Sequence, residues 1–221
     1  MDILLQQIIN GLVLGSMYAL IALGYTMVYG IIQLINFAHG EVLMVGALTS
    51  WSIVGWMQQS MPGLPGWAML LLSMVMACAV AAVLNFCIEK VAYKRLRNSP
   101  RLAPLITAIG MSLFLQTVAM VIWKPTYKPY PTLLPIDPYE IGGAVITPTQ
   151  ILILAITVMS LAAMVYLVGH TKLGRAMRAT AESPNVAALM GVKPDFVISA
   201  TFVIGAILAA IAGVMWAANY G

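Results

Sequence analysis

The feature that most constrains the fold is a long uncharged stretch at the start of the chain. Residues 3–38 contain no Asp, Glu, Lys or Arg and are mostly apolar. As one helix they would extend about 54 Å, whereas the hydrocarbon core of a bilayer is about 30 Å thick. A single straight span therefore cannot use the whole stretch. We expect a transmembrane helix over about residues 8–28, a break near Tyr29 and Gly30, and then a short or re-entrant piece that ends at Gly40.

The composition indicates an integral membrane protein. Hydrophobic residues fill 62% of the 221 positions and charged residues 8%, against about 25% charged in soluble domains. Five further apolar runs predict membrane spans, the first of them short, at about residues 42–56, 67–88, 102–123, 151–169 and 196–218. The expected fold class is all-α: a polytopic transmembrane helical bundle of about six spans that forms a single domain over residues 1–221.

The basic residues predict the orientation in the membrane. One cluster lies between Lys90 and Arg101 and a second between Lys172 and Lys193. Loops rich in Lys and Arg stay in the cytoplasm, and two predicted spans separate the clusters, so the span count agrees with this placement. The net charge of +4 is explained by these loops without a nucleic-acid partner. The Pro-rich segment 124–149 is expected to be an ordered external loop, while the side of the N-terminus stays open.

Small residues recur four positions apart in the apolar runs. Helices in lipid pack through close backbone approach at such residues, because no hydrophobic effect drives one helix onto another. We expect these residues to pack inside one subunit, with a subunit interface as the alternative. They are Gly11 and Gly15, Ala77 and Ala81, and Gly205, Ala209 and Gly213.

A polar motif, Asn36-Phe-Ala-His39-Gly40-Glu41, interrupts the apolar sequence. Ionisable groups in such a place are costly and mark a functional site by default. On a regular helix His39 and Glu41 would point in different directions, whereas a backbone broken at Gly40 would bring them to one polar pocket. The motif is either a hinge whose polar groups cap a helix end, or part of a translocation path or its gate. One His and one Glu are too few to bind a metal ion.

The second basic loop, residues 170–195, contains helix signals. Ser183 before Pro184 predicts an N-cap, and Gly191 predicts the end of the helix, so a short helix is expected over about Pro184–Met190. This helix is too short to span a membrane. It either rests on the membrane surface or docks into a groove on a cytoplasmic partner. Its apolar side chains need a cover, and they are Val186, Ala187, Leu189 and Met190.

Several motifs are missing from the sequence. It contains no Gly-x-x-x-x-Gly-Lys-Ser/Thr pattern, so the chain has no P-loop for ATP. Glu41 is the only acid expected near a span interior, so the carboxylate relay of many proton-coupled carriers is lacking. No Ser/His/Asp set and no metal cluster is recognisable. We therefore predict no catalytic residue, metal or cofactor in this chain, and the alternative function class is a self-sufficient channel or secondary carrier.

Three blocks of sequence carry a resemblance to a known family. They are the stretch from Asn10 to Glu41, which ends in Leu34-Ile-Asn-Phe-Ala-His-Gly-Glu41; Gly174-Arg175 with Arg178-Ala179; and Ala187-x-x-x-Gly191. With them the chain resembles the inner-membrane permease subunits of bacterial ABC importers for branched-chain amino acids. Members of this family usually continue beyond this length, and Gly221 directly follows the last apolar run. The chain is therefore expected to be truncated at its C-terminus.

The resemblance implies a function and a set of partners. Two related permeases would form a heterodimer in the bacterial inner membrane, with two ATP-binding subunits on the cytoplasmic face and a periplasmic protein that delivers leucine, isoleucine or valine. ATP hydrolysis in the partner subunits would switch the permeases between outward- and inward-facing states. A permease for urea or short amides is the near alternative, because specificity belongs largely to the binding protein.

The family also implies a role for the short helix. Importer permeases share a cytoplasmic coupling segment of the pattern Glu-Ala-Ala-x-x-x-Gly. Aligned on Gly191, this chain matches at Ala187 and Gly191 but has Asn185 in place of the Glu. The resemblance favours docking on an ATPase subunit over a membrane-surface helix. The expected coupling residues are Pro184, Asn185, Ala187, Leu189, Met190 and Gly191.

Overall fold

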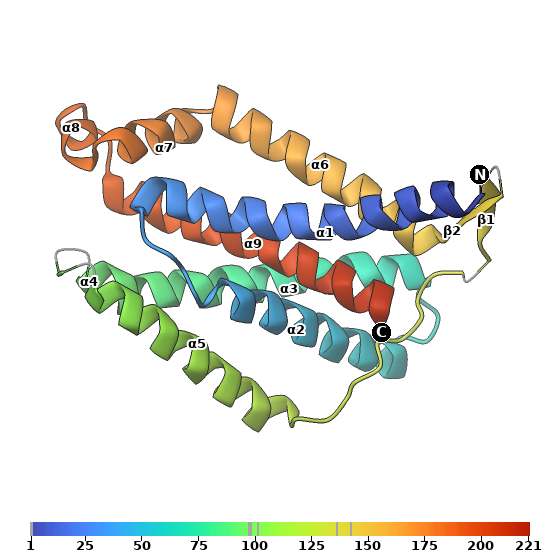
Figure 1. The fold of residues 1–221 in the computed structure, drawn as a ribbon. Helices are drawn as coiled ribbons and strands as arrows, with labels where there is room; N and C mark the ends of the chain where they lie inside the picture. The colour runs from blue at the N-terminus through green and yellow to red at the C-terminus, as the bar shows by residue number, and fades with distance from the viewer. Residues whose placement is uncertain (1, 97–98, 101, 136, 142) are drawn as a thin grey trace.

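The computed structural model describes residues 2–96, 99–100, 102–135, 137–141 and 143–221. Within these residues helices dominate, and the long ones run side by side as a bundle (Figure 1). The long helices are α1 (Asp2–Ile32), α2 (His39–Ser60), α3 (Gly66–Ile88), α5 (Leu102–Trp123), α6 (Pro148–His170) and α9 (Pro194–Tyr220). Five of them, all except α2, are long and apolar enough to cross a membrane. The predicted all-α polytopic bundle is confirmed.

Helix α2 is less apolar than the others and longer than the predicted span 42–56. Polar residues extend it at both ends, with His39 at its start and Gln58, Gln59 and Ser60 at its finish. It lies between α3 and α9, and its packing against both compensates for its lower hydropathy.

Helix α9 is the centre of the bundle, because α1, α2 and α3 all pack against it. Glycines allow close approaches between these helices. A Cβ on Gly24 would lie 2.9 Å from the Gly205 carbonyl oxygen, and a Cβ on Gly46 would lie 2.8 Å from the Ala210 Cα. The predicted packing role of Gly205, Ala209 and Gly213 is confirmed.

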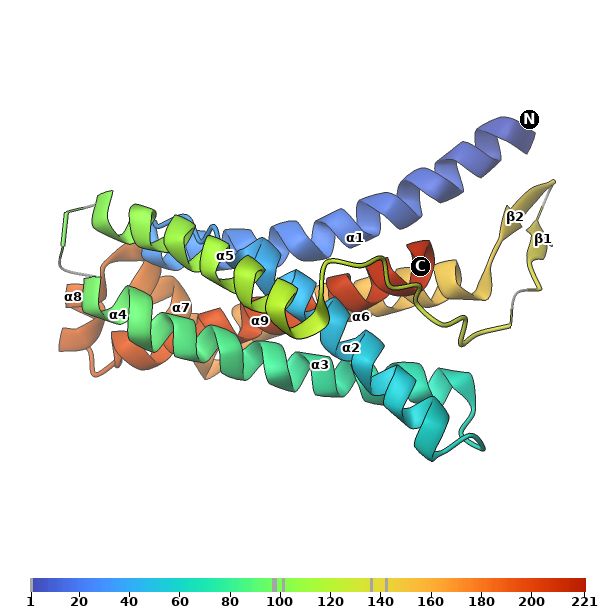
Figure 2. The same cartoon turned by 90° about the horizontal axis from the view of Figure 1, so that it is seen from below.

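Of the other two predicted small-residue pairs, one is buried and the other is exposed. Ala77 and Ala81 are fully buried within the subunit, as expected. Gly11 and Gly15 are exposed, and a Cβ at either would meet no atom within 4 Å. The expectation that Gly11 and Gly15 pack inside the subunit is therefore wrong, because they lie on a face of α1 that points away from the core, while Val13 and Met17 are buried. The N-terminal end of α1 also diverges from the other helices (Figure 2).

Helix α1 contains most of the first apolar stretch. The helix continues past Tyr29 and Gly30 to Ile32, and the chain then turns at Gln33, which has φ of 53°. Residues 33–38 are irregular and lead directly into α2, so the stretch forms one helix long enough to cross a membrane once, and the described residues contain no separate re-entrant piece. The N-terminal end of α1 lies at the end of the bundle opposite the basic loops (Figure 1).

Two segments expected to be loops have regular structure. After α3 the chain continues as a π-helical turn (Glu89–Tyr93) and a short α4 (Lys94–Leu96). In the segment expected to be external, β1 (Tyr139–Ile141) pairs antiparallel with β2 (Ala144–Ile146). The Gln6 carboxamide donates to the Val145 carbonyl (3.0 Å) and accepts from the Val145 N–H (2.7 Å), which fixes the hairpin to α1. The prediction of an ordered loop is confirmed.

Candidate functional site

The second basic loop folds into two helices, α7 (Lys172–Glu182) and α8 (Pro184–Leu189). The Ser183 hydroxyl accepts a hydrogen bond from the Val186 N–H (3.4 Å), as an N-cap does. Gly191 has φ of +84°, and the next residue, Val192, donates its N–H to the Ala187 carbonyl (3.1 Å). This is the closing turn that glycine favours at a helix end. The predicted N-cap and stop are confirmed, whereas α7 was not predicted.

Three apolar side chains on α8 and its last turn are exposed. Val186 is 58% exposed, Leu189 86% and Met190 81%. Positions three and four apart share one face of a helix, so the three form one uncovered surface, which we call the apolar knob. Pro184, Asn185 and Gly191 border it and are also exposed.

Ala187 does not belong to the apolar knob. It is only 3% exposed, because its side chain packs toward the body of the chain. The expectation that Ala187 contributes to a docked surface is therefore wrong, although its carbonyl helps to close the turn at Gly191.

The motif around Gly40 is arranged differently from the predicted single pocket. Gly40 lies within the first turn of α2 and the backbone break precedes His39. Because consecutive residues of a helix turn by about 100°, His39 and Glu41 point away from each other. His39 faces α1, with its ring 5.9 Å from that of Tyr25. Glu41 faces α5, so the regular-helix alternative is correct and the two side chains face different helices.

Glu41 makes a polar contact between α2 and the middle of α5. Its Oε1 accepts hydrogen bonds from the Ser112 hydroxyl (2.8 Å) and the Gln116 carboxamide (2.7 Å). A carboxylate in an apolar setting needs such donors, because burying a charge without partners is costly. Sequence reasoning did not connect Ser112 and Gln116 with Glu41. Their spacing of four places them on one face of α5, which was a usable signal.

Asn36 and His39 leave polar atoms without partners. The Asn36 Oδ1 accepts from the Tyr93 hydroxyl (2.9 Å) and the Ala38 N–H (3.1 Å), but its Nδ2 has no partner among the described residues. Neither ring nitrogen of His39 has a partner there with the geometry of a full hydrogen bond, although the ring interacts with the Ile21 backbone. The two residues are 3% and 2% exposed and line a cavity of about 410 Å³ between α1 and α2. The N-cap residue Ala38 has no capping side chain, but its N–H donates to the Asn36 carboxamide, so the interpretation as a capped helix end stays an alternative.

A second polar contact, at Glu89, was missed. Glu89 is fully buried and accepts a hydrogen bond from the Ser199 hydroxyl (2.8 Å), while Lys90 lies 3.5 Å from its carboxylate. The inference that Glu41 is the only acid near a span interior is therefore wrong. The signal was present in the sequence as a spacing of four residues, which continues one buried face of α3 past the end of that helix. The residues on this face are Ala77, Ala81, Asn85 and Glu89.

Comparisons with known proteins place the chain. Residues 7–221 match the family described as branched-chain amino acid transport system, permease component. The high-affinity branched-chain amino acid transport system permease protein BraD of Pseudomonas aeruginosa is 44% identical, over 98% of this chain and 72% of that protein. The corresponding protein LivH is 44% identical in Escherichia coli K12 and 43% identical in Salmonella typhimurium, in both over 98% of this chain and 71% of the relative.

No solved structure matches the chain. The family match covers nearly all of its length, and two of the relatives are 44% identical over 98% of the chain. The resemblance drawn from the sequence is confirmed, and the chain belongs to the family of permease components of branched-chain amino acid transport systems.

Proposed function

We propose that the chain is the permease subunit of an ATP-driven importer that moves leucine, isoleucine and valine across the bacterial inner membrane. The observation that carries the proposal is the apolar knob at the basic end of the bundle, outside the membrane-crossing helices. Exposed apolar surface of this kind marks a site of interaction. The names of the relatives supply the substrate class.

The shape of the apolar knob suits a partner protein with an apolar groove on its surface. Val186, Leu189 and Met190 project from one helix face, as in the helix-in-groove mode of recognition. The partner in the proposal is a cytoplasmic ATP-binding subunit, one of two, so that ATP is used outside this chain. A second, homologous permease and a periplasmic amino-acid-binding protein complete the transporter.

Reconstitution of the complete transporter in lipid vesicles tests this function. Uptake of radiolabelled leucine should require ATP in the lumen, the ATPase subunits and the external binding protein. A proton gradient without ATP should give no uptake. Leucine uptake by the permeases alone, driven by a proton gradient, would support a secondary carrier instead. Uptake of urea but not of leucine would support the amide permease.

We also propose that the residues around Gly40 belong to the translocation path or its gate. Asn36 and His39 support this role because their unpartnered polar atoms line a cavity between α1 and α2. Glu41 supports it because its hydrogen bonds join α2 to α5, and two helices that repack between states must remake such a contact.

Glu41→Gln removes the charge and keeps the shape of the side chain. We expect leucine uptake to fall about tenfold or more, since a hydrogen bond to a charged group contributes about 1.5–3 kcal/mol and about 1.4 kcal/mol is a factor of ten in rate. Membrane insertion should not change. Glu140→Gln, on the exposed hairpin, is the matched control and should keep full uptake. If uptake and ATPase activity of the Glu41 variant both equal those of the wild type, the motif is a structural hinge.

A further inference from the structure

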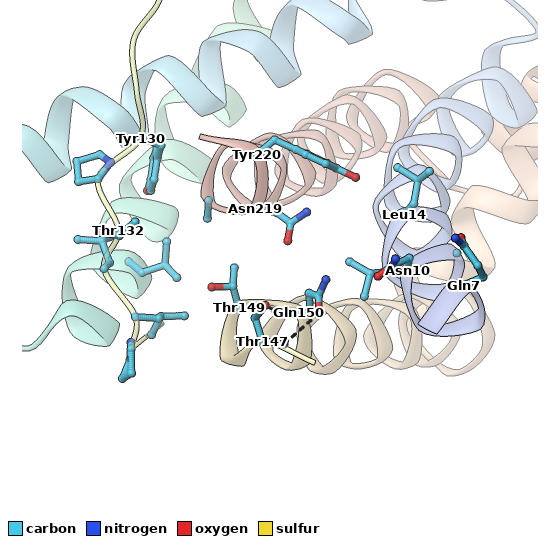
Figure 3. A pocket seen from close by; sticks show the side chains of 18 residues that line it. Gln7, Asn10, Leu14, Tyr130, Thr132, Thr147, Thr149, Gln150, Asn219 and Tyr220 are labelled. Atoms are coloured by element: carbon cyan, nitrogen blue, oxygen red, sulfur yellow. Dashed lines mark hydrogen bonds between the residues drawn. The ribbon is translucent and has the colours of Figure 1, made fainter. Parts of the chain in front are cut away.

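A cavity of about 680 Å³ lies at the end of the bundle opposite the basic loops (Figure 3). Its walls come from the N-terminal parts of α1 and α6, the last residues of α9, and the external segment around Tyr130. A volume of this size is typical of sites for small molecules. The motifs discussed above do not include it.

The polar part of the lining is rich in carboxamides. Gln7, Asn10, Gln150 and Asn219 supply four of them, and five hydroxyl side chains accompany them. In Figure 3 Asn219 extends from α9 toward Thr149 and Gln150 at the start of α6, and Asn10 approaches from α1. No charged side chain lines the cavity among the described residues.

Hydrogen bonds with two serine hydroxyls hold the Tyr130 side chain in place in the cavity wall. The Tyr130 hydroxyl lies 2.8 Å from the Ser50 hydroxyl, which donates to the Ser73 hydroxyl (3.0 Å). Tyr130 is 7% exposed, and this burial raises its pKa above the ordinary value, although the hydrogen bonds with Ser50 and Ser73 act in the opposite direction. The phenol therefore stays neutral, and the cavity has a preformed wall without charge.

The remaining lining is aliphatic. Val13 and Leu14 from α1, Leu70 from α3, and Leu133 and Leu134 from the external segment contribute to it. The cavity thus has an apolar part and a carboxamide-rich part, both within the space of one small ligand.

This lining has a clear chemical preference. A carboxamide is both donor and acceptor, so a set of them satisfies an ammonium and a carboxylate group together. A ligand with a net charge would lose hydration without gaining a countercharge, which is unfavourable. We propose that the cavity is the external acceptor site of the permease and binds a zwitterionic amino acid with an aliphatic side chain. This inference rests on the proposed function and adds the place of first contact.

Cysteine protection in the assembled transporter tests the proposal. Asn219→Cys and Thr149→Cys are each made in a permease that lacks Cys78 and Cys87, and a membrane-impermeant maleimide is added from outside. With leucine at ten times its dissociation constant, labelling should slow about tenfold, because the reaction rate follows the free fraction of the site. Lysine and glutamate should not slow it. Gln59→Cys, an exposed carboxamide position at the same end of the bundle, is the control and should react equally with and without leucine.

An isosteric variant gives a second readout. Asn219→Leu removes one carboxamide and keeps a similar side-chain volume. It should raise the KM for leucine about tenfold, because the charged ligand loses one hydrogen bond. Gln59→Leu should leave KM unchanged.

Three results would overturn the acceptor site: cavity cysteines that do not react without ligand, no protection by leucine, or equal protection by lysine. If the wild-type transporter still takes up leucine with ATP, only the acceptor site fails and the proposed function stands. If the wild type takes up no leucine, the proposed function itself fails.

Discussion

Gly191→Val should abolish ATP-dependent leucine uptake while the permease stays folded and inserted. Gly191 has φ of +84°, a conformation that costs a residue with a side chain about 1–2 kcal/mol. No atom lies within 4 Å of the position that its Cβ would take, so the effect comes from the backbone alone. Relief of this strain would open the turn that closes α8 and displace Leu189 and Met190, the most exposed part of the knob.

Two controls distinguish the effect of opening the turn at Gly191 from the effect of replacing any glycine by valine. Gly63→Val lies in the turn between α2 and α3, where a Cβ meets no atom of the described residues within 4 Å, and should keep full uptake. Gly191→Asn should restore part of the uptake, because Asn tolerates positive φ better than Val. The measurements are leucine uptake and the ratio of ATPase subunits to permease after purification. Wild-type values of both in Gly191→Val would remove the coupling role and leave a membrane-surface helix.

The position of Ala187 changes the choice of docking variants. A charge at a buried site such as Ala187 would disturb the packing of α8, so its effect on docking would be indirect. Leu189→Glu instead places the charge on the exposed knob. Arg175 and Arg178 are exposed on α7, and Arg178 donates to the Val168 carbonyl, so their replacement should have the milder effect of losing surface contacts.

Elements with strong local signals could be predicted from the sequence. The span Leu102–Trp123 has the expected bounds, because its apolar run ends in charged or Pro-containing sequence on both sides. The short helix from Pro184 was also predictable, since Ser183, Pro184 and Gly191 each act within a few residues of the chain. These features depend on neighbours in sequence.

Features that depend on distant partners could not be predicted. The direction of Glu41 is set by Ser112 and Gln116, which lie 71 and 75 residues later in the chain. The burial of Glu89 requires Ser199, 110 residues away. Spacing identifies side chains that share a face, but it does not identify the helix that covers that face.

The same limit applies to the small residues. Gly11 and Gly15 have the expected spacing, but a Cβ at either would meet no atom of the described residues within 4 Å, whereas Gly46, which we did not single out, packs closely against α9. A Cβ at Gly46 would lie 2.8 Å from the Ala210 Cα and 3.0 Å from its Cβ. The obstacle is backbone, so no change of rotamer relieves it.

Gly46→Leu should therefore destabilise the permease strongly. Overpacking costs about 1–3 kcal/mol where side chains can move, and contact with a backbone atom places this site at the upper end or beyond. We expect α2 to separate from α9 and to carry His39 and Glu41 out of their contacts, so that uptake is lost together with thermal stability. The measurement is the Tm of the purified permease in detergent. Gly55→Leu makes the same replacement nine residues later in α2, where no atom lies within 4 Å, and should keep the wild-type Tm. Equal Tm values for the two variants would show that the contact between Gly46 and Ala210 does not hold α2 against α9.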